Sequence, residues 1–212
     1  MPVALPPMTV QAERPIDDRV HELSGLTAAD LRRAAEAEAE SGPGLLVIHP
    51  DLAPVSRLAP LLNREGKAGF VVADMTDVDA FTPIPEAALP ASRVYRLEGI
   101  SRGDELLNWT PNEALPKILQ EGRTPLTASE GVFLLLQRPD LLERGRCFMT
   151  IGSRLRKQSG ALDARTPALW ISNGTGRDGR ENRSAPKLGW CWAGNRHTWL
   201  GIASAEARAP LT

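Results

Sequence analysis

Cysteine, tyrosine and long apolar runs are scarce in this 212-residue chain. Two cysteines, Cys147 and Cys191, are too few for a disulfide framework in a chain of this length. The longest uninterrupted apolar runs, Leu45–Ile48 and Val132–Leu136, are far shorter than a membrane span. The first ten residues lack the basic and apolar stretches of a secretory signal. We therefore expect a cytoplasmic protein with no membrane contact.

The overall composition is that of an ordinary globular protein. Hydrophobic residues make up 42% of the chain and charged residues 24%, and the net charge is −1. Such a chain buries a core and is not intrinsically disordered. Its length suits one large domain or two small ones.

The charges are nevertheless unevenly distributed. Residues 1–145 carry 14 Lys and Arg against 22 Asp and Glu, whereas residues 146–196 carry ten against three. Such an asymmetry is typical of a protein with an anionic partner. The alternative is that the basic part pairs with the acidic part inside one fold.

The pattern of elements predicts an α+β fold. We expect a flexible arm at 1–14, a single domain at 15–205 and a tail at 206–212. Within the domain, 15–145 is acidic and 146–205 is basic and rich in tryptophan.

Helices and strands are predicted from capping residues and short apolar runs. Thr110 and Thr127, each followed three residues later by glutamate, begin two helices that we expect to form a helical hairpin. Strands at 44–49 and 69–73 flank a helix at 55–64, which indicates a small βαβ-like unit. Antiparallel strands are expected at 147–151, 168–172, 189–193 and 197–203.

The segment 189–199 is the most informative for function. Gly194-Asn195, between two aromatic-rich runs, predicts a two-residue hairpin turn with positive φ. That register places four aromatic rings on one face and Cys191 and Arg196 on the other. The four are Trp190, Trp192, His197 and Trp199. They form either hydrophobic core or a stacking surface for a flat ligand.

The loop 172–180 is rich in glycine and is followed by further cations. Its glycines match a dinucleotide-binding fingerprint formally, but no helix and no later acidic residue complete the motif. Two interpretations remain, an anion cradle and a solvated surface loop.

Other chemistry finds little support in the sequence. Cys191 and His197 are weak catalytic candidates, since the expected register points them to opposite faces. His21, His49 and His197 are too scattered for a metal site, and the acidic cluster at 74–79 lacks calcium-loop spacing. We therefore expect no cofactor and no metal.

Several blocks of the sequence occur together in the same order as in a known family. They are 102–116, 122–127, 147–154, 164–172 and 185–199. Over about residues 45–205 the chain resembles an uncharacterised family found mainly in high-GC actinobacteria. The resemblance implies one cytoplasmic domain and carries no assigned activity, so it identifies no catalytic residue.

These observations predict a small-molecule site, for binding or catalysis, in the C-terminal strands. Its ligand would be flat or aromatic and anionic. The expected contacts are Arg177, Arg183, Lys187, Trp190, Trp192, Asn195, Arg196 and His197. The main alternative is a nucleic-acid or ribosome-associated accessory protein that uses the basic third on phosphates. A third is a protein that docks on an acidic partner. The sequence predicts no oligomeric state.

Overall fold

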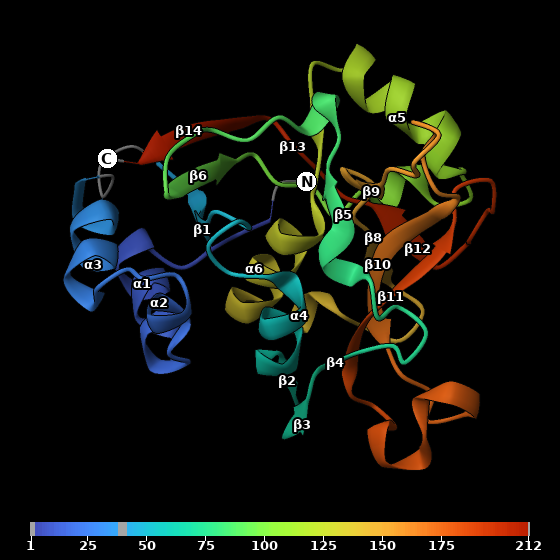
Figure 1. Ribbon diagram of the computed structural model, residues 1–212, viewed down its shortest axis with the longest axis horizontal. Helices are drawn as coiled ribbons and strands as arrows, with labels where there is room; N and C mark the ends of the chain where they lie inside the picture. The colour runs from blue at the N-terminus through green and yellow to red at the C-terminus, as the bar shows by residue number, and fades with distance from the viewer. Residues whose placement is uncertain (1–2, 38–41, 212) are drawn as a thin grey trace.

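Two β-sheets and a buried helix between them organise the chain (Figure 1). The structure is a computed structural model that describes residues 3–37 and 42–211, apart from the side chain of Arg177. Helices and strands contribute comparably, which confirms the α+β class predicted from the sequence.

The first sheet has three antiparallel strands in the order β1-β6-β14. Their bounds are Gly44–Ile48, Val94–Glu98 and Ala207–Leu211. All five residues of β1 are buried, as its apolar sequence predicts. The tail expected at 206–212 is wrong, because β14 pairs with β6 along its whole length.

The second sheet has five strands in the order β12-β8-β10-β11-β4. In chain order the bounds are β4 Phe70–Val71, β8 Cys147–Met149, β10 Arg165–Ile171, β11 Pro186–Trp192 and β12 Leu200–Ile202. β10 is antiparallel to both of its neighbours, β8 and β11. At the edges of the sheet, β4 runs parallel to β11 and β12 runs parallel to β8. The C-terminal strands therefore lie close to their predicted positions, in a mixed sheet. The βαβ-like unit is wrong, since β1 and β4 belong to different sheets.

Three two-stranded ladders complete the strands. They pair β2 (Asn63–Arg64) with β3 (Lys67–Ala68), β5 (Phe81–Pro83) with β9 (Ser153–Leu155), and β7 (Thr124–Pro125) with β13 (Ser204–Ala205).

Three helices form a group at the N-terminus, and one of them, α1, packs on β1 of the first sheet (Figure 1). They are α1 (Met8–Asp17), α2 (Val20–Leu23) and α3 (Ala28–Ala37). The buried Gln11 ties α1 to β1, because its side-chain amide donates to Gly44 O at 2.7 Å and accepts from Leu46 N at 3.0 Å. The flexible arm predicted at 1–14 is therefore wrong for its described residues, and Val3 N–H also donates to Ile100 O at 2.8 Å.

The capping boxes predicted at Thr110 and Thr127 are both formed. They begin α5 (Pro111–Gln120) and α6 (Ala128–Gln137). Nine consecutive residues of α6, Ala128–Leu136, are buried, as expected of a helix that is apolar on every side. α6 packs on β1, β10 and the short α4 (Val55–Leu58), while α5 packs mainly on β7. The two helices thus belong to different layers and form no helical hairpin.

Candidate functional site

One face of the second sheet gathers the chemically distinctive side chains. β10 and β11 pair with Trp170 opposite Lys187 and Thr166 opposite Cys191. Directly paired residues share a face of a sheet, so these four side chains project the same way. On β8, Met149 pairs with Ala168, and alternation places Cys147 on this face too.

Trp170 lies across this face of the sheet, in space that is open because residue 189 is a glycine and has no side chain. A Cβ at position 189 would come within 2.5 Å of the Trp170 ring and 3.0 Å of Val72. Lys187 lies over the same ring, with its Nζ 4.5 Å from the centroid, and Trp199 meets it edge to face at 6.3 Å. The missing side chain of Gly189 thus positions the indole.

The segment after β11 turns, but it does not return as a hairpin. Asn195 N–H donates to Trp192 O at 3.0 Å, and neither Gly194 nor Asn195 has a positive φ. β11 pairs with β10 and β4, whereas β12 pairs with β8, so the predicted register is wrong. Instead, the loop before α5 holds this segment, because Asn108 N–H donates to His197 O at 2.8 Å.

The corrected chain path brings Cys191 and His197 to one cavity of about 220 Å³. Five of the predicted ligand contacts line this cavity beside Cys191. They are Lys187, Trp190, Trp192, Asn195 and His197. Trp190 and Trp192 meet edge to face, with centroids 4.6 Å apart. Trp199 does not line this cavity, and the β10–β11 register pairs Trp190 with Pro167 and Trp192 with Arg165, on the other face of the sheet from Cys191 and Lys187. The predicted single wall of four aromatic rings is therefore wrong.

His197 lines this cavity and has a ring nitrogen without a hydrogen-bond partner among the described residues. This nitrogen, Nε2, is buried. Burial lowers the pKa of the imidazole, so the ring is neutral at neutral pH. A neutral ring can donate from one nitrogen and accept at the other. It therefore suits a polar group on a flat ligand.

A second cavity of about 300 Å³ adjoins the first, since Trp170 and Cys191 line both. Its other walls include Cys147, Trp199 and Asn173. Arg144 is the one charged residue among the described residues that line it. Arg144 is exposed, and its guanidinium donates to Ser184 Oγ at 2.9 Å. This guanidinium keeps further N–H donors for an anion.

The thiols of these cavities do not favour nucleophilic catalysis. Burial raises the pKa of Cys191 to about 11, against a weaker opposing effect of the Lys187 charge. Burial also raises the pKa of the Cys147 thiol. Both side chains are therefore protonated at neutral pH, and a thiol is a poor nucleophile. His197 shares a cavity with Cys191, but the geometry supports binding better than covalent chemistry.

Lys187 is held by the glycine-rich loop and does not stand free. Its Nζ lies 2.5 Å from the carboxylate of Asp178, and both residues are less than a tenth exposed. Asp178 also accepts from Ser172 Oγ at 2.8 Å. The predicted anion contact at Lys187 is therefore already occupied by a carboxylate of the same chain.

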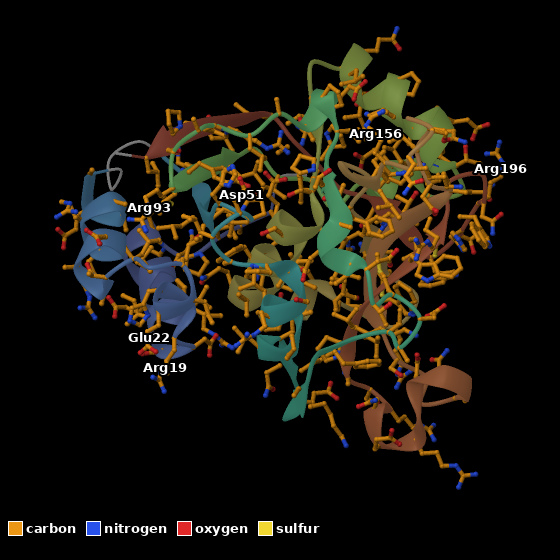
Figure 2. All side chains as sticks on the ribbon, viewed as in Figure 1. Arg19, Glu22, Asp51, Arg93, Arg156 and Arg196 are labelled. Carbon is orange, nitrogen blue, oxygen red and sulfur yellow. The ribbon has the colours of Figure 1, made fainter. Side chains whose placement is uncertain are left out.

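The remaining predicted cations are dispersed. Arg196 pairs with Glu113 on α5 and donates to Asn108 O at 2.8 Å, and it lies at the outer edge of the molecule (Figure 2). Arg183 is exposed on the loop 173–185, and the side chain of Arg177 lies outside the described part of the structure. Neither Arg183 nor Arg196 lines the two cavities.

The charge asymmetry is partly resolved by internal pairing. Three cations of 146–196 pair with carboxylates of the acidic part: Arg146 with Asp104, Arg165 with Asp77, and Arg196 with Glu113. Exposed Arg180 and Arg183 remain on the loop 173–185.

Comparison with known families matches residues 14–211 to a family of unknown function, DUF5701. The chain belongs to this family. The match confirms the resemblance to an uncharacterised family and extends it beyond 45–205 at both ends. No curated protein and no solved structure matches the chain.

Membership in DUF5701 assigns no activity, so the two adjoining cavities are judged on their geometry alone. Among residues 3–37 and 42–211, no three His, Cys, Asp or Glu side chains form a group suited to a metal ion. Within the same ranges, no helix combines the length and the apolarity needed to cross a bilayer.

Three residues of the site escaped sequence reasoning: Arg144, Cys147 and Trp170. Trp170 lies in a correctly predicted strand, but its contact with Lys187 depends on the β10–β11 register. Arg144 falls just outside the basic segment that begins at Arg146. The local sequence around each carries no signal that links it to 189–199.

Proposed function

We propose that this protein binds a small, flat molecule that carries an anionic group. The ligand lies against Trp170 and Trp199 in the cavity of about 300 Å³, with its anionic group at Arg144. One observation carries this proposal. Two half-buried indoles line one cavity, and an arginine is the only charged residue among the described residues that line it. Ligand pockets are typically apolar and aromatic with few polar groups.

The adjoining cavity extends the same site. The residues that line it, among them Trp170 and the neutral His197, accommodate a further substituent with a hydrogen-bonding atom. Its charged lining residues are Asp74, Asp178 and Lys187, so this half of the site disfavours an anion. The anionic end of the ligand accordingly lies at Arg144, in place of the predicted Arg183 and Arg196.

Arg144→Ala tests the charge contact. We expect this variant to bind benzoate or indole-3-carboxylate at least about tenfold more weakly, because a charge-assisted hydrogen bond contributes ~1.5–3 kcal/mol. Benzamide, which has the same ring without the charge, should bind both proteins alike. Isothermal titration calorimetry measures all of these affinities.

Arg57→Ala is the matched control, since Arg57 is an exposed arginine that lines neither cavity. It should bind the carboxylates with unchanged affinity. Equal affinity of benzoate for the natural protein and Arg144→Ala, or no saturable binding of any aromatic carboxylate, contradicts the proposal.

Nucleic-acid binding through the basic third stays a prediction, and the exposed Arg180 and Arg183 are the residues that favour it. Binding through phosphate contacts weakens steeply as salt concentration rises, because counterions are released. Fluorescence anisotropy with RNA and DNA oligomers across a salt series separates the two functions. Tight binding that weakens steeply with salt would support the alternative.

A further inference from the structure

A third cavity, of about 210 Å³, lies at the first turn of α6. None of its lining residues lines the two cavities described above. Part of its wall is apolar and comes from Pro54, Val55 and Phe81. Hydroxyl groups and two carboxylates supply its polar part.

Ser129 gives this cavity two unused hydrogen-bond donors. The residue is 4% exposed, and its Oγ has no hydrogen-bond partner among the described residues. In the first turn of α6, Ala128 N–H donates to Ser153 Oγ at 2.9 Å and Glu130 N–H to Thr127 Oγ1 at 3.3 Å. The N–H of Ser129 has no acceptor within the helix. Because a buried donor without a partner costs free energy, an acceptor placed here is stabilising.

The position of these donors favours an anionic acceptor. They lie at the N-terminus of a ten-residue helix, where the aligned peptide dipoles create a positive potential. The carboxylate of Glu130 in the same turn does not cancel this potential, since Arg208 Nε lies 2.6 Å from it. A carboxylate group is therefore suited to the α6 end of the cavity.

Two carboxylates, of Asp51 and Asp79, also line the cavity. Both carboxylate oxygens of Asp79 accept from Ser56, one from its N–H at 2.9 Å and one from its hydroxyl at 2.6 Å. Asp51, just beyond the end of β1, is 85% exposed (Figure 2). A carboxylate accepts more than one hydrogen bond at each oxygen, so both groups can still receive an ammonium. These two charges disfavour a bare anion in the cavity.

We propose that this cavity binds a free amino acid with a short aliphatic side chain. Its carboxylate accepts from the N–H and hydroxyl of Ser129, and its ammonium lies between Asp51 and Asp79. The side chain packs on Pro54, Val55 and Phe81. This site is independent of the tryptophan-lined cavities and of their ligand.

L-Valine is the probe, and two analogues test the two ends of the site. We expect saturable binding of L-valine by isothermal titration calorimetry. N-acetyl-L-valine lacks the ammonium and L-valinamide lacks the carboxylate, so each should bind at least tenfold more weakly. Absence of saturable valine binding at millimolar concentrations overturns the proposal, as does an analogue that binds as well as valine.

Ser129→Ala removes the hydroxyl donor from the cavity. This variant should bind L-valine at least tenfold more weakly while its affinity for benzoate is unchanged. Ser92→Ala is the matched control, because Ser92 also has a buried hydroxyl without a partner but does not line the cavity. It should bind valine like the natural protein.

Asp51→Asn provides an independent variant at an exposed position, which keeps the proposal testable even if Ser129→Ala fails to fold. It should weaken the binding of valine but not that of N-acetyl-L-valine. Natural affinity for valine in a folded Ser129→Ala protein, or in Asp51→Asn, overturns the assignment.

Discussion

Replacing Arg208 with methionine is expected to lower the free energy of unfolding by about 3–5 kcal/mol, as is typical when one partner of a buried ion pair is removed. Arg208 on β14 donates to both carboxylate oxygens of Glu130, at 2.6 and 2.8 Å. The side chains are only 5% and 0% exposed. The substitution leaves a buried carboxylate without its cation, although Tyr95 still donates to it at 3.0 Å. Urea denaturation followed by circular dichroism measures the loss.

Two further variants separate this effect from the general cost of a substitution. The exposed pair Arg19–Glu22 lies on the surface of the N-terminal helices (Figure 2), so Arg19→Met should leave the midpoint unchanged. Combining Glu130→Gln with Arg208→Met removes the uncompensated charge and should recover part of the lost stability. If Arg208→Met unfolds at the same urea concentration as the natural protein, the pair is not structurally important.

Gly103→Ala is expected to destabilise the protein by about 2–5 kcal/mol, because overpacking costs ~1–3 kcal/mol and a left-handed backbone ~1–2 kcal/mol. Gly103 has φ +77°, and a Cβ there would lie 1.9 Å from the carbonyl oxygen of Ile202. Ile202 N–H donates to Gly103 O at 3.2 Å, so the added methyl group displaces β12 directly. Thermal unfolding monitored by circular dichroism measures the change.

Gly122→Ala is the control for the backbone contribution alone. Gly122 has φ +68°, but nothing lies within 4 Å of the position that its Cβ would take. It should lose only the ~1–2 kcal/mol of a left-handed alanine. Equal losses in the two variants would mean that contact with β12 is unimportant.

Features set by neighbouring residues were predictable from the sequence. The capping boxes at Thr110 and Thr127 need only a hydroxyl and a glutamate three residues apart, and both were located correctly. The strands at 44–48 and 186–192 likewise follow from short runs of apolar and aromatic residues.

Features set by distant pairing were not predictable in the same way. β14 (Ala-Arg-Ala-Pro-Leu) has no β-branched or aromatic residue and includes Pro210, and its position as a strand depends on β6, more than one hundred residues earlier. β4 similarly pairs with β11 instead of β1. The Gly194-Asn195 dipeptide indicates a turn, which forms, but it does not determine which strand follows as the partner.

The candidate site shows the same division. Trp190, Trp192, Asn195 and His197 were predicted to contact one ligand, and they line one cavity because they are close in sequence. Trp170, Cys147 and Arg144 join them only through the pairing of β8, β10 and β11. Arg183 and Arg196 were chosen by net charge, which does not indicate where a side chain points, and they line neither cavity.

A crystal structure of the protein with 4-bromobenzoate tests the central claim most directly, since bromine is located by its anomalous scattering. The account predicts a bromine peak within the cavity lined by Trp170 and Trp199, with the carboxylate of the probe at the guanidinium of Arg144. A probe bound only elsewhere on the protein, or a cavity that stays free of it at saturating concentration, would contradict the account.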